Sequence, residues 1–116
     1  MTWRRRSKFG AVRTEVDGIS FASKAEAARW VELQRLEAAG EIRKLRRQVR
    51  FELPVNDVLV CRYVADFVYQ RKAGAGWDEV VEDVKGVETP EFKLKAKLMQ
   101  AIYRIGIQIV RPRARA

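Results

Sequence analysis

The segment VVEDVKG, at residues 80–86, places three charged side chains in a valine-rich run that ends in a glycine. Such a run is typical of a buried β-strand. Ionised side chains are costly to bury unless they are paired or bind a metal ion. Because side chains alternate along a strand, Asp83 and Lys85 should point to one face and Glu82 to the other. The segment is therefore a candidate site for chemistry.

A second acid, Asp66, lies in the apolar run YVADFVY at residues 63–69, with Val64 and Val68 beside it on the same face. If the two runs are neighbouring strands, each places one carboxylate in the sheet, and two close carboxylates repel each other. A divalent cation between them would remove this repulsion, and Mg²⁺ prefers carboxylate oxygens and water. Lys85 would reach the same site, where an ammonium group can orient or activate a water or neutralise charge on a phosphate.

Glu26 is a further candidate, because it falls within the inward stripe of a strongly predicted helix that also contains Trp30, Leu33 and Leu36. An acid at this position either reaches into a site or serves the helix itself. Ser23 suits the N-cap, and Glu26 is three residues further on, so a capping box would also explain it.

The other candidates also have simple structural explanations. Asp66 could be a buried acid that pairs with an arginine such as Arg62. Asp83 and Lys85 could form a pair of little energetic value on an exposed edge strand. An Asp-x-Lys triplet alone is a weak signal. Two strand acids, a lysine at the two-residue offset and a helix acid upstream favour a functional site when they occur together.

The composition restricts the chemistry that is available. The 116 residues have the usual size of one domain, 47% are hydrophobic, and the formal net charge is +9, which indicates a polyanionic partner such as nucleic acid. The absence of histidine excludes histidine general bases and the common zinc sites. The single cysteine, Cys61, excludes an internal disulfide and a cysteine-cluster zinc site.

The localisation that we expect is cytoplasmic, in a phage-infected or bacterial host cell. No apolar run approaches the roughly 20 residues that a membrane span requires. The basic N-terminus, MTWRRRSKFGAVR, also lacks the apolar segment of a signal peptide.

Two helices are predicted from their end signals. The first begins after Ser23 and ends at Gly40. The second begins with Thr89 as N-cap and Pro90 in the first turn, and we expect it to run to about residue 105, where Gly106 ends it.

The remaining regular structure reads as strands. The sequence predicts a hairpin at 14–21 that turns at Asp17–Gly18, and a turn at 71–78, RKAGAGWD. The core strands are expected at 49–55, 59–69, 79–85 and 107–110. The order helix, three strands, helix, strand predicts an α/β fold with one mixed four-stranded sheet and helices on both faces. We assign residues 1–13 to a basic arm, 14–110 to the domain and 111–116 to a basic tail.

The chain resembles a minimal PD-(D/E)XK nuclease. The resemblance covers about residues 8–110 and includes the order of elements, a restriction-endonuclease-like αβββαβ core. The family signature is an acid on the first helix, an Asp on the second core strand and Asp/Glu-x-Lys on the third, matched here by Glu26, Asp66, Asp83 and Lys85. The chain is also similar to small phage and prophage nucleases, and to the endonuclease subunit of some transposases, in which a glutamine precedes the first core strand as Gln48 does here.

The resemblance implies a metal-dependent DNA endonuclease that binds one or two Mg²⁺ or Mn²⁺ ions. Asp66, Asp83 and Glu26 would hold metal, with the backbone carbonyl of Val84 as a further ligand, and Lys85 would position the attacking water. We therefore treat Glu26, Asp66, Asp83 and Lys85 as the candidate catalytic residues.

Basic residues on the second helix and at both ends are candidates for DNA binding, because phosphate contacts dominate affinity. One helix face is polar and opposes Leu94, Leu98 and Ile105, and Lys95 lies nearer the apolar side. The DNA-binding candidates are Arg4, Arg5, Arg6, Lys8, Gln48, Lys93, Lys95, Lys97 and Arg104, and the tail adds Arg111, Arg113 and Arg115.

Within this activity we favour a structure-selective enzyme for branched DNA, similar to a Holliday-junction resolvase, in phage or prophage DNA processing. Two symmetric cuts call for a homodimer, for which Val58, Leu59 and Val60 offer an apolar contact. The alternatives are a less selective nicking or flap nuclease, a DNA-binding module that keeps the fold without catalysis, and a basic RNA-binding or structural protein.

Overall fold

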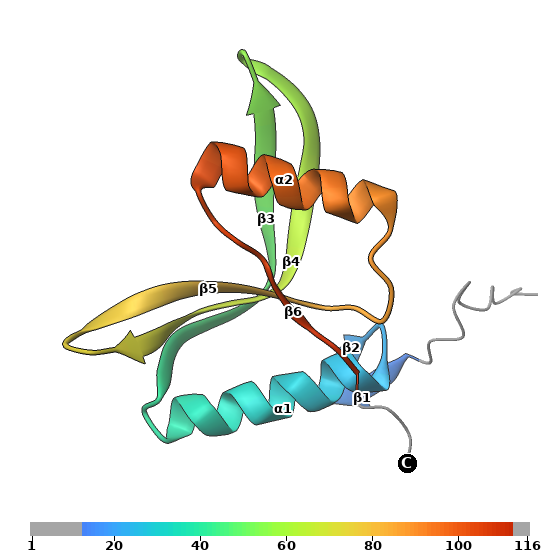
Figure 1. Cartoon of the computed structure of the whole chain (residues 1–116). Helices are drawn as coiled ribbons and strands as arrows, with labels where there is room; N and C mark the ends of the chain where they lie inside the picture. Colours follow the sequence, from blue (N-terminus) through green and yellow to red (C-terminus); the bar gives the residue numbers. More distant parts are fainter. Residues whose placement is uncertain (1–12, 113–116) are drawn as a thin grey trace, which may run out of the picture.

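The computed structural model of the chain describes residues 13–112, and the basic arm and the end of the tail lie outside these residues. Within residues 13–112, eight helices and strands follow one another (Figure 1). They are β1 (Thr14–Val16), β2 (Ile19–Phe21), α1 (Lys24–Ala38), β3 (Ile42–Val55), β4 (Val58–Ala73), β5 (Gly76–Val84), α2 (Pro90–Tyr103) and β6 (Gln108–Val110).

The central sheet has the strand order β3-β4-β5-β6. The first three strands form an antiparallel meander, and α2 carries the chain back so that β6 pairs parallel with β5. This arrangement confirms the predicted α/β fold with a mixed four-stranded sheet and helices on its two sides. The small β1–β2 hairpin forms a separate sheet, and it turns at Asp17 and Gly18, which both have left-handed φ angles of 50° and 79°.

Three strands extend further than the sequence indicated. The turn predicted at 71–78 is present but shorter, because β4 and β5 stay paired as far as Ala73 and Gly76, and Gly74 and Ala75 form the turn. Gly74, with φ of 56°, permits this tight connection. Strand β3 likewise begins at Ile42 and not at 49. Most of the polar residues in these added strand ends are exposed, among them Arg43, Arg46, Lys72 and Asp78.

Helix α2 ends earlier than expected. Its last residue is Tyr103, and the left-handed position belongs to Arg104, with φ of 58°, and not to Gly106. Ile105 then packs into the core beneath the helix, which explains why the chain leaves the helix before the glycine. The expected apolar side of α2 is also partly wrong. Leu94 is 59% exposed, whereas Phe92 and Met99 are buried.

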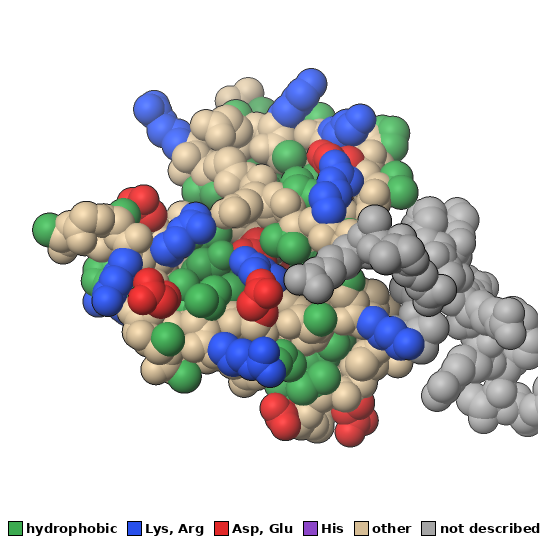
Figure 2. All heavy atoms as spheres, turned by 60° about the horizontal axis from the view of Figure 1, so that its bottom comes forward, with side chains coloured by type: hydrophobic (Ala, Val, Ile, Leu, Met, Phe, Trp, Pro, Cys, Tyr) green, Lys and Arg blue, Asp and Glu red, His purple; other side chains and the backbone are tan. Residues whose placement is uncertain are grey.

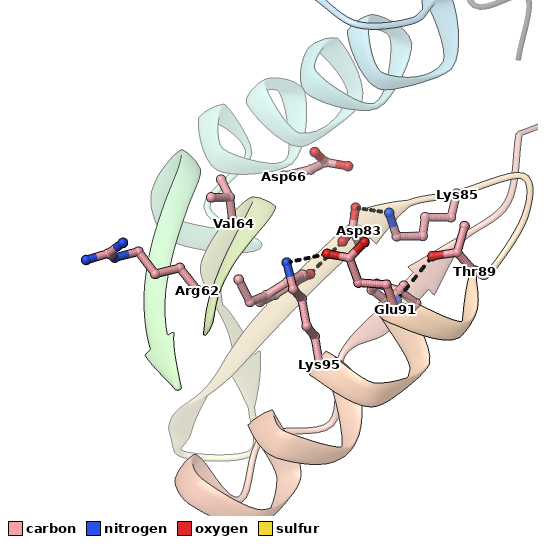
Figure 3. A pocket seen from close by; sticks show the side chains of 10 residues that line it. Arg62, Val64, Asp66, Asp83, Lys85, Thr89, Glu91 and Lys95 are labelled. Atoms are coloured by element: carbon pink, nitrogen blue, oxygen red, sulfur yellow. Dashed lines mark hydrogen bonds and ion pairs between the residues drawn. The ribbon is translucent and has the colours of Figure 1, made fainter. Parts of the chain in front are cut away.

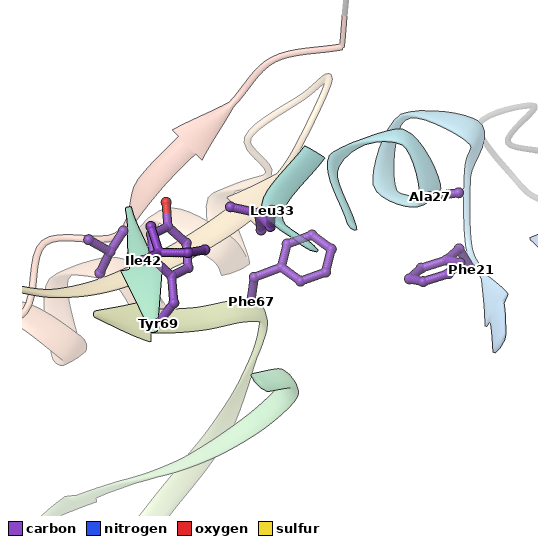
Figure 4. Packing of buried hydrophobic residues seen from close by; sticks show 7 residues of the cluster. Phe21, Ala27, Leu33, Ile42, Phe67 and Tyr69 are labelled. Atoms are coloured by element: carbon purple, nitrogen blue, oxygen red, sulfur yellow. The ribbon is translucent and has the colours of Figure 1, made fainter. Parts of the chain in front are cut away.

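The sheet separates two hydrophobic clusters. On the α1 side, Phe21, Leu33 and Phe67 pack with neighbours from β3, β4 and β5 (Figure 4). On the α2 side, Phe92 and Met99 pack against the β3–β4 hairpin and β6.

A kink in β3 and β4 connects the two clusters. Gln48 has a left-handed φ of 53° and lies opposite Asp66, between the pairs Arg47–Phe67 and Val49–Ala65. Phe67 belongs to the α1 cluster, but Ala65, two residues away, belongs to the α2 cluster. The strand therefore changes the face that it presents at Asp66, and the β3–β4 hairpin bends away from β5 (Figure 1). Asp66 lies at this bend, within reach of both sides of the sheet.

In the part of the chain that the structure describes, neither helix is long and apolar enough to span a membrane.

Two leucines test this packing. Leu33 is fully buried, so Leu33→Ala should lower the free energy of unfolding by about 2–5 kcal/mol, because it leaves a cavity. Leu94 is mostly exposed, and Leu94→Ala should change it by no more than about 0.5 kcal/mol. Urea denaturation followed by circular dichroism measures both values. Similar losses in the two variants would contradict the assignment of the core.

Candidate active site

The candidate site lies where β4 and β5 separate. Their last ladder pair is Phe67–Glu82, and Asp66 and Asp83 are the next residues on the two strands. Beyond this pair, the Asp66 side chain replaces a backbone partner from β4, because its Oδ2 accepts a hydrogen bond from the Val84 backbone N–H at 2.8 Å. The separation opens a pocket of about 360 Å³ between β4, the end of β5 and the start of α2 (Figure 3). Among its lining residues are Tyr63, Asp66, Asp83, Lys85, Glu91 and Lys95.

Asp83 contacts one group from β4 and one from the segment that follows β5. The side chain is almost fully buried, and its Oδ2 accepts a hydrogen bond from the Tyr63 hydroxyl at 2.6 Å. The Lys85 Nζ lies 3.8 Å from its Oδ1. Burial and the neighbouring Asp66 carboxylate nevertheless raise the pKa of Asp83 to about 7. The nearby lysine and tyrosine therefore do not fully compensate the negative charge of this carboxylate.

Glu26 takes part in the N-terminal capping of α1, and its side chain also reaches the site. Its backbone N–H donates to the Ser23 hydroxyl at 3.1 Å, and its Oε2 accepts from the Ala22 backbone N–H at 3.1 Å. The other oxygen accepts from the Gln48 side-chain amide, which also lies 3.5 Å from Asp66 Oδ1. Burial, with the Asp66 charge second, raises the pKa of Glu26 to about 7.

Glu82 points to the opposite face of the sheet, as the alternation along β5 requires. It is fully buried and accepts hydrogen bonds from Arg29 Nε at 2.6 Å, Arg29 Nη2 at 2.8 Å and the Tyr69 hydroxyl. The bond to Glu82 raises the pKa of Arg29, and burial, with Glu82 second, raises the pKa of Tyr69 to about 12. Of the two adjacent acids, Asp83 is therefore the one that faces the pocket.

Two lysines complete the pocket. Lys85 Nζ lies 4.6 Å from the centre of the Phe92 ring, so the aromatic face supports its position. Lys95 extends from α2 toward the same pocket and pairs with Glu91 at 3.2 Å (Figure 3). The pocket thus combines two close carboxylates with two ammonium groups, an arrangement that can hold a cation and a phosphate side by side.

A family model described as a protein of unknown function, DUF1064, matches residues 6–112. The chain belongs to the DUF1064 family. No curated protein and no solved structure matches it.

In this DUF1064 chain the four candidate catalytic residues lie in one region. Asp66, Asp83 and Lys85 line the pocket, and Glu26 is joined to Asp66 through Gln48. Within residues 13–112, however, no three His, Cys, Asp or Glu side chains gather closely enough to form a metal-binding group. The carboxylates form a row from Glu26 through Asp66 to Asp83.

The structure does not support an ion pair between Asp66 and Arg62, the alternative that the sequence offered. Arg62 extends away from the carboxylates (Figure 3), and the ion pairs among the described residues include none between Arg62 and Asp66. Asp66 instead bonds to Gln48 and to the Val84 amide.

The DNA-binding candidates are divided by the structure. Lys95 and Gln48 lie at the site, whereas Lys93, Lys97 and Arg104 are exposed on and just after α2. Arg111 was expected in a basic tail, but it pairs with Glu88 and donates to the Gly86 carbonyl. It therefore fastens the loop that follows Lys85. The remaining candidates lie outside the described residues: Arg4, Arg5, Arg6, Lys8, Arg113 and Arg115.

Sequence reasoning missed Tyr63 and Glu91. Tyr63 lies three residues before Asp66, and regular alternation would place it on the opposite face from Asp66. It reaches Asp83 only because β4 changes face at the kink. Glu91 pairs with Lys95, and the i, i+4 spacing of the two residues on the predicted helix is the signal that could have found it.

The raised pKa values predict a pH dependence of stability. In the folded chain the pKa values of Asp83 and Glu26 are both about 7, whereas their ordinary values are 3.8 and 4.5. Both carboxyl groups therefore bind a proton more tightly in the folded chain than in the unfolded chain. Their contribution to stability is therefore complete below about pH 4 and is lost as the pH rises through 7. In EDTA, the free energy of unfolding should fall between pH 5 and 8 more steeply in the native chain than in Asp66→Asn, which lacks the repelling charge. Equal slopes in urea titrations of the two chains would contradict this electrostatic description.

Proposed function

We propose that the chain is a metal-dependent DNA endonuclease that hydrolyses phosphodiester bonds. The observation that carries the proposal is the pair Asp66 and Asp83, which face each other where β4 and β5 separate, with Lys85 beside Asp83 in the same pocket. Two close carboxylates are unfavourable in a fold that could have placed neutral residues there. A bound cation would offset the repulsion between the two carboxylates, and a phosphate would pair with Lys85.

The donor set fits Mg²⁺, with Mn²⁺ as a substitute. Asp66 and Asp83 offer hard oxygen ligands, and burial, with the neighbouring Asp66 charge, raises the pKa of Asp83, so a nearby cation would stabilise its charged form. Mg²⁺ commonly takes one or two carboxylates and fills its other positions with water and substrate oxygens, so a three-carboxylate group is not required. The Val84 carbonyl and Glu26 are the further ligands that the resemblance to PD-(D/E)XK nucleases implies.

Five of the residues that line the pocket would then have roles in the reaction. Asp66 and Asp83 would hold the metal, and Tyr63 would fix the orientation of Asp83 through its hydroxyl. Lys85 would orient the water that attacks phosphorus and would offset charge on the phosphate. When bound, the metal would lower the pKa of a coordinated water and stabilise the transition state. Lys95, at the pocket wall, would contact a phosphate oxygen.

Among the residues that the structure describes, those of α2 should make most of the DNA contacts. Residues 13–112 contain 18 Lys and Arg and 15 Asp and Glu, so most of the net charge of +9 belongs to the two ends of the chain. On the face in Figure 2, positive and negative side chains are interspersed. Lys93 and Lys97 are exposed on the helix that borders the pocket, which places them well for contacts to neighbouring phosphates.

The finer predictions concern substrate, assembly and compartment. We propose branched DNA as the substrate and a homodimer as the active form, in the cytoplasm of a bacterial host. Val58 and Val60, in the strand assigned to the dimer contact, are 63% and 56% exposed in the single chain. Both the dimer and the preference for branched DNA stay predictions.

Cleavage of labelled four-way junction, flap, duplex and single-stranded DNA tests the function. With Mg²⁺ or Mn²⁺ the native chain should cut, and with EDTA it should not. Asp83→Asn and Lys85→Met should each lower the cleavage rate by at least about 100-fold, because each removes a group that acts on the reacting phosphate. Glu79→Gln, an exposed substitution on the same strand, is the matched control and should leave the rate unchanged.

The outcomes separate the candidate functions. Symmetric cuts in the junction alone support a resolvase, and cuts in every substrate leave a less selective nuclease. If the native chain binds DNA but never cuts with any metal, the catalytic proposal fails and a binding module remains.

The salt dependence of binding tests the α2 contacts. Lys93→Ala/Lys97→Ala should weaken duplex binding and reduce the slope of log K against log [salt] by about 2, since each phosphate contact contributes about 0.9. The exposed pair Arg35→Ala/Lys72→Ala is the control, because these residues do not line the pocket. Equal slopes for both variants in fluorescence anisotropy titrations would show that α2 does not contact the phosphates.

A further inference from the structure

The fully buried carboxylate of Glu82 has a role that the proposed chemistry does not use. Its side chain has no exposed surface, and both of its oxygens accept hydrogen bonds. Arg29 of α1 donates to both oxygens through its planar guanidinium, and Tyr69 of β4 donates through its hydroxyl. We call these three residues the Arg29 anchor. Removing a carboxylate from water is costly, and this geometry is the kind that offsets the cost.

The anchor lies at a particular point in the sheet. Glu82 belongs to the last pair of the β4–β5 ladder, opposite Phe67. The next residue, Asp83, enters the pocket, and the following amide, that of Val84, donates to Asp66. Past Glu82, β5 is no longer held by the β4 ladder, and the three-residue strand β6, which pairs with Glu82 to Val84, is its sheet partner there. The anchor fixes the strand to α1 at the position where the support from β4 ends.

Glu82 and Asp83 form a natural contrast. Each accepts a hydrogen bond from a tyrosine of β4, Tyr69 for Glu82 and Tyr63 for Asp83. Only Glu82 has a closely bonded arginine, whereas the nearest cation to Asp83 is Lys85, at 3.8 Å. Arg29 thus neutralises Glu82, whereas Asp83 has no such close partner and could bind a cation from solution.

We propose that the Arg29 anchor positions the end of β5, so that Asp83 and the Val84 amide keep their places relative to Asp66. The effect on cleavage rests on the proposed function, but the effect on the backbone does not. A buried ion pair is often no more stabilising than apolar residues of similar size. Apolar residues would not form the directional hydrogen bonds that join Arg29 of α1 and Tyr69 of β4 to Glu82 of β5.

The test compares two multiple variants. Arg29→Met/Tyr69→Phe/Glu82→Met removes the whole anchor and leaves none of its polar groups buried without a partner, so it should still fold. Arg46→Met/Glu79→Met is the matched control, because it removes an exposed ion pair between β3 and β5. Amide hydrogen exchange by NMR, in the absence of metal and DNA, reports on the backbone directly.

Exchange of the Val84 amide should become at least about tenfold faster in the anchor variant, while the amides of Val80 and Val81 change little. The control variant should leave all three amides unchanged. If the anchor variant folds and its Val84 amide exchanges at the native rate, the proposal is wrong. If the anchor variant does not fold, Tyr69→Phe alone, which removes one bond to Glu82, must give the same local increase, and an unchanged rate again overturns the proposal.

A second readout separates positioning from a general loss of structure. If the native chain cleaves DNA, the anchor variant should have a cleavage rate at least about tenfold lower with an unchanged Kd for DNA, because the anchor does not contact the substrate. A native cleavage rate in the anchor variant would overturn its positioning role. If the native chain does not cleave, the proposed function fails, and the Val84 exchange rate still decides the inference.

Discussion

The organisation of this chain depends on the end of the β4–β5 ladder, where the Asp66 carboxylate binds the Val84 amide in place of a strand partner. This one bond lets β5 leave β4 without an unsatisfied backbone donor, and it brings Asp66 and Asp83 to the same pocket. The bend at Gln48 and Asp66 makes the bond possible, because it turns β4 away from β5. Fold and site thus share the same backbone feature.

The electrostatics of the site follow from this geometry. The backbone brings Asp66 and Asp83 together, and the pKa of Asp83 rises because burial removes its carboxylate from water and because the Asp66 charge lies close by. Glu82, one residue away, has the opposite environment, since Arg29 and Tyr69 satisfy it completely. Two adjacent residues of β5 therefore hold one acid that the protein neutralises and one acid whose pKa is raised.

Local patterns predicted much of this arrangement. The caps at Ser23 and Thr89 and the Asp17–Gly18 turn are short-range signals, and all three appear in the structure. Alternation along a strand correctly separated Glu82 from Asp83. The parts that failed need information from distant residues. The bend at Gln48, a residue with no special preference for a left-handed conformation, and the reach of Tyr63 to Asp83 both depend on tertiary packing. For the same reason the helix end at Arg104 and the exposure of Leu94 were not predicted.

The central claim of the proposal is that two like-charged carboxylates, Asp66 and Asp83, lie close together because a divalent cation binds both of them. Anomalous diffraction from crystals of the native chain grown with Mn²⁺, with and without DNA, tests it most directly. The account predicts a Mn²⁺ peak in contact with both carboxylates, absent from crystals of Asp83→Asn. A well-ordered pocket without a peak in either crystal, or a peak only at another site, would contradict it.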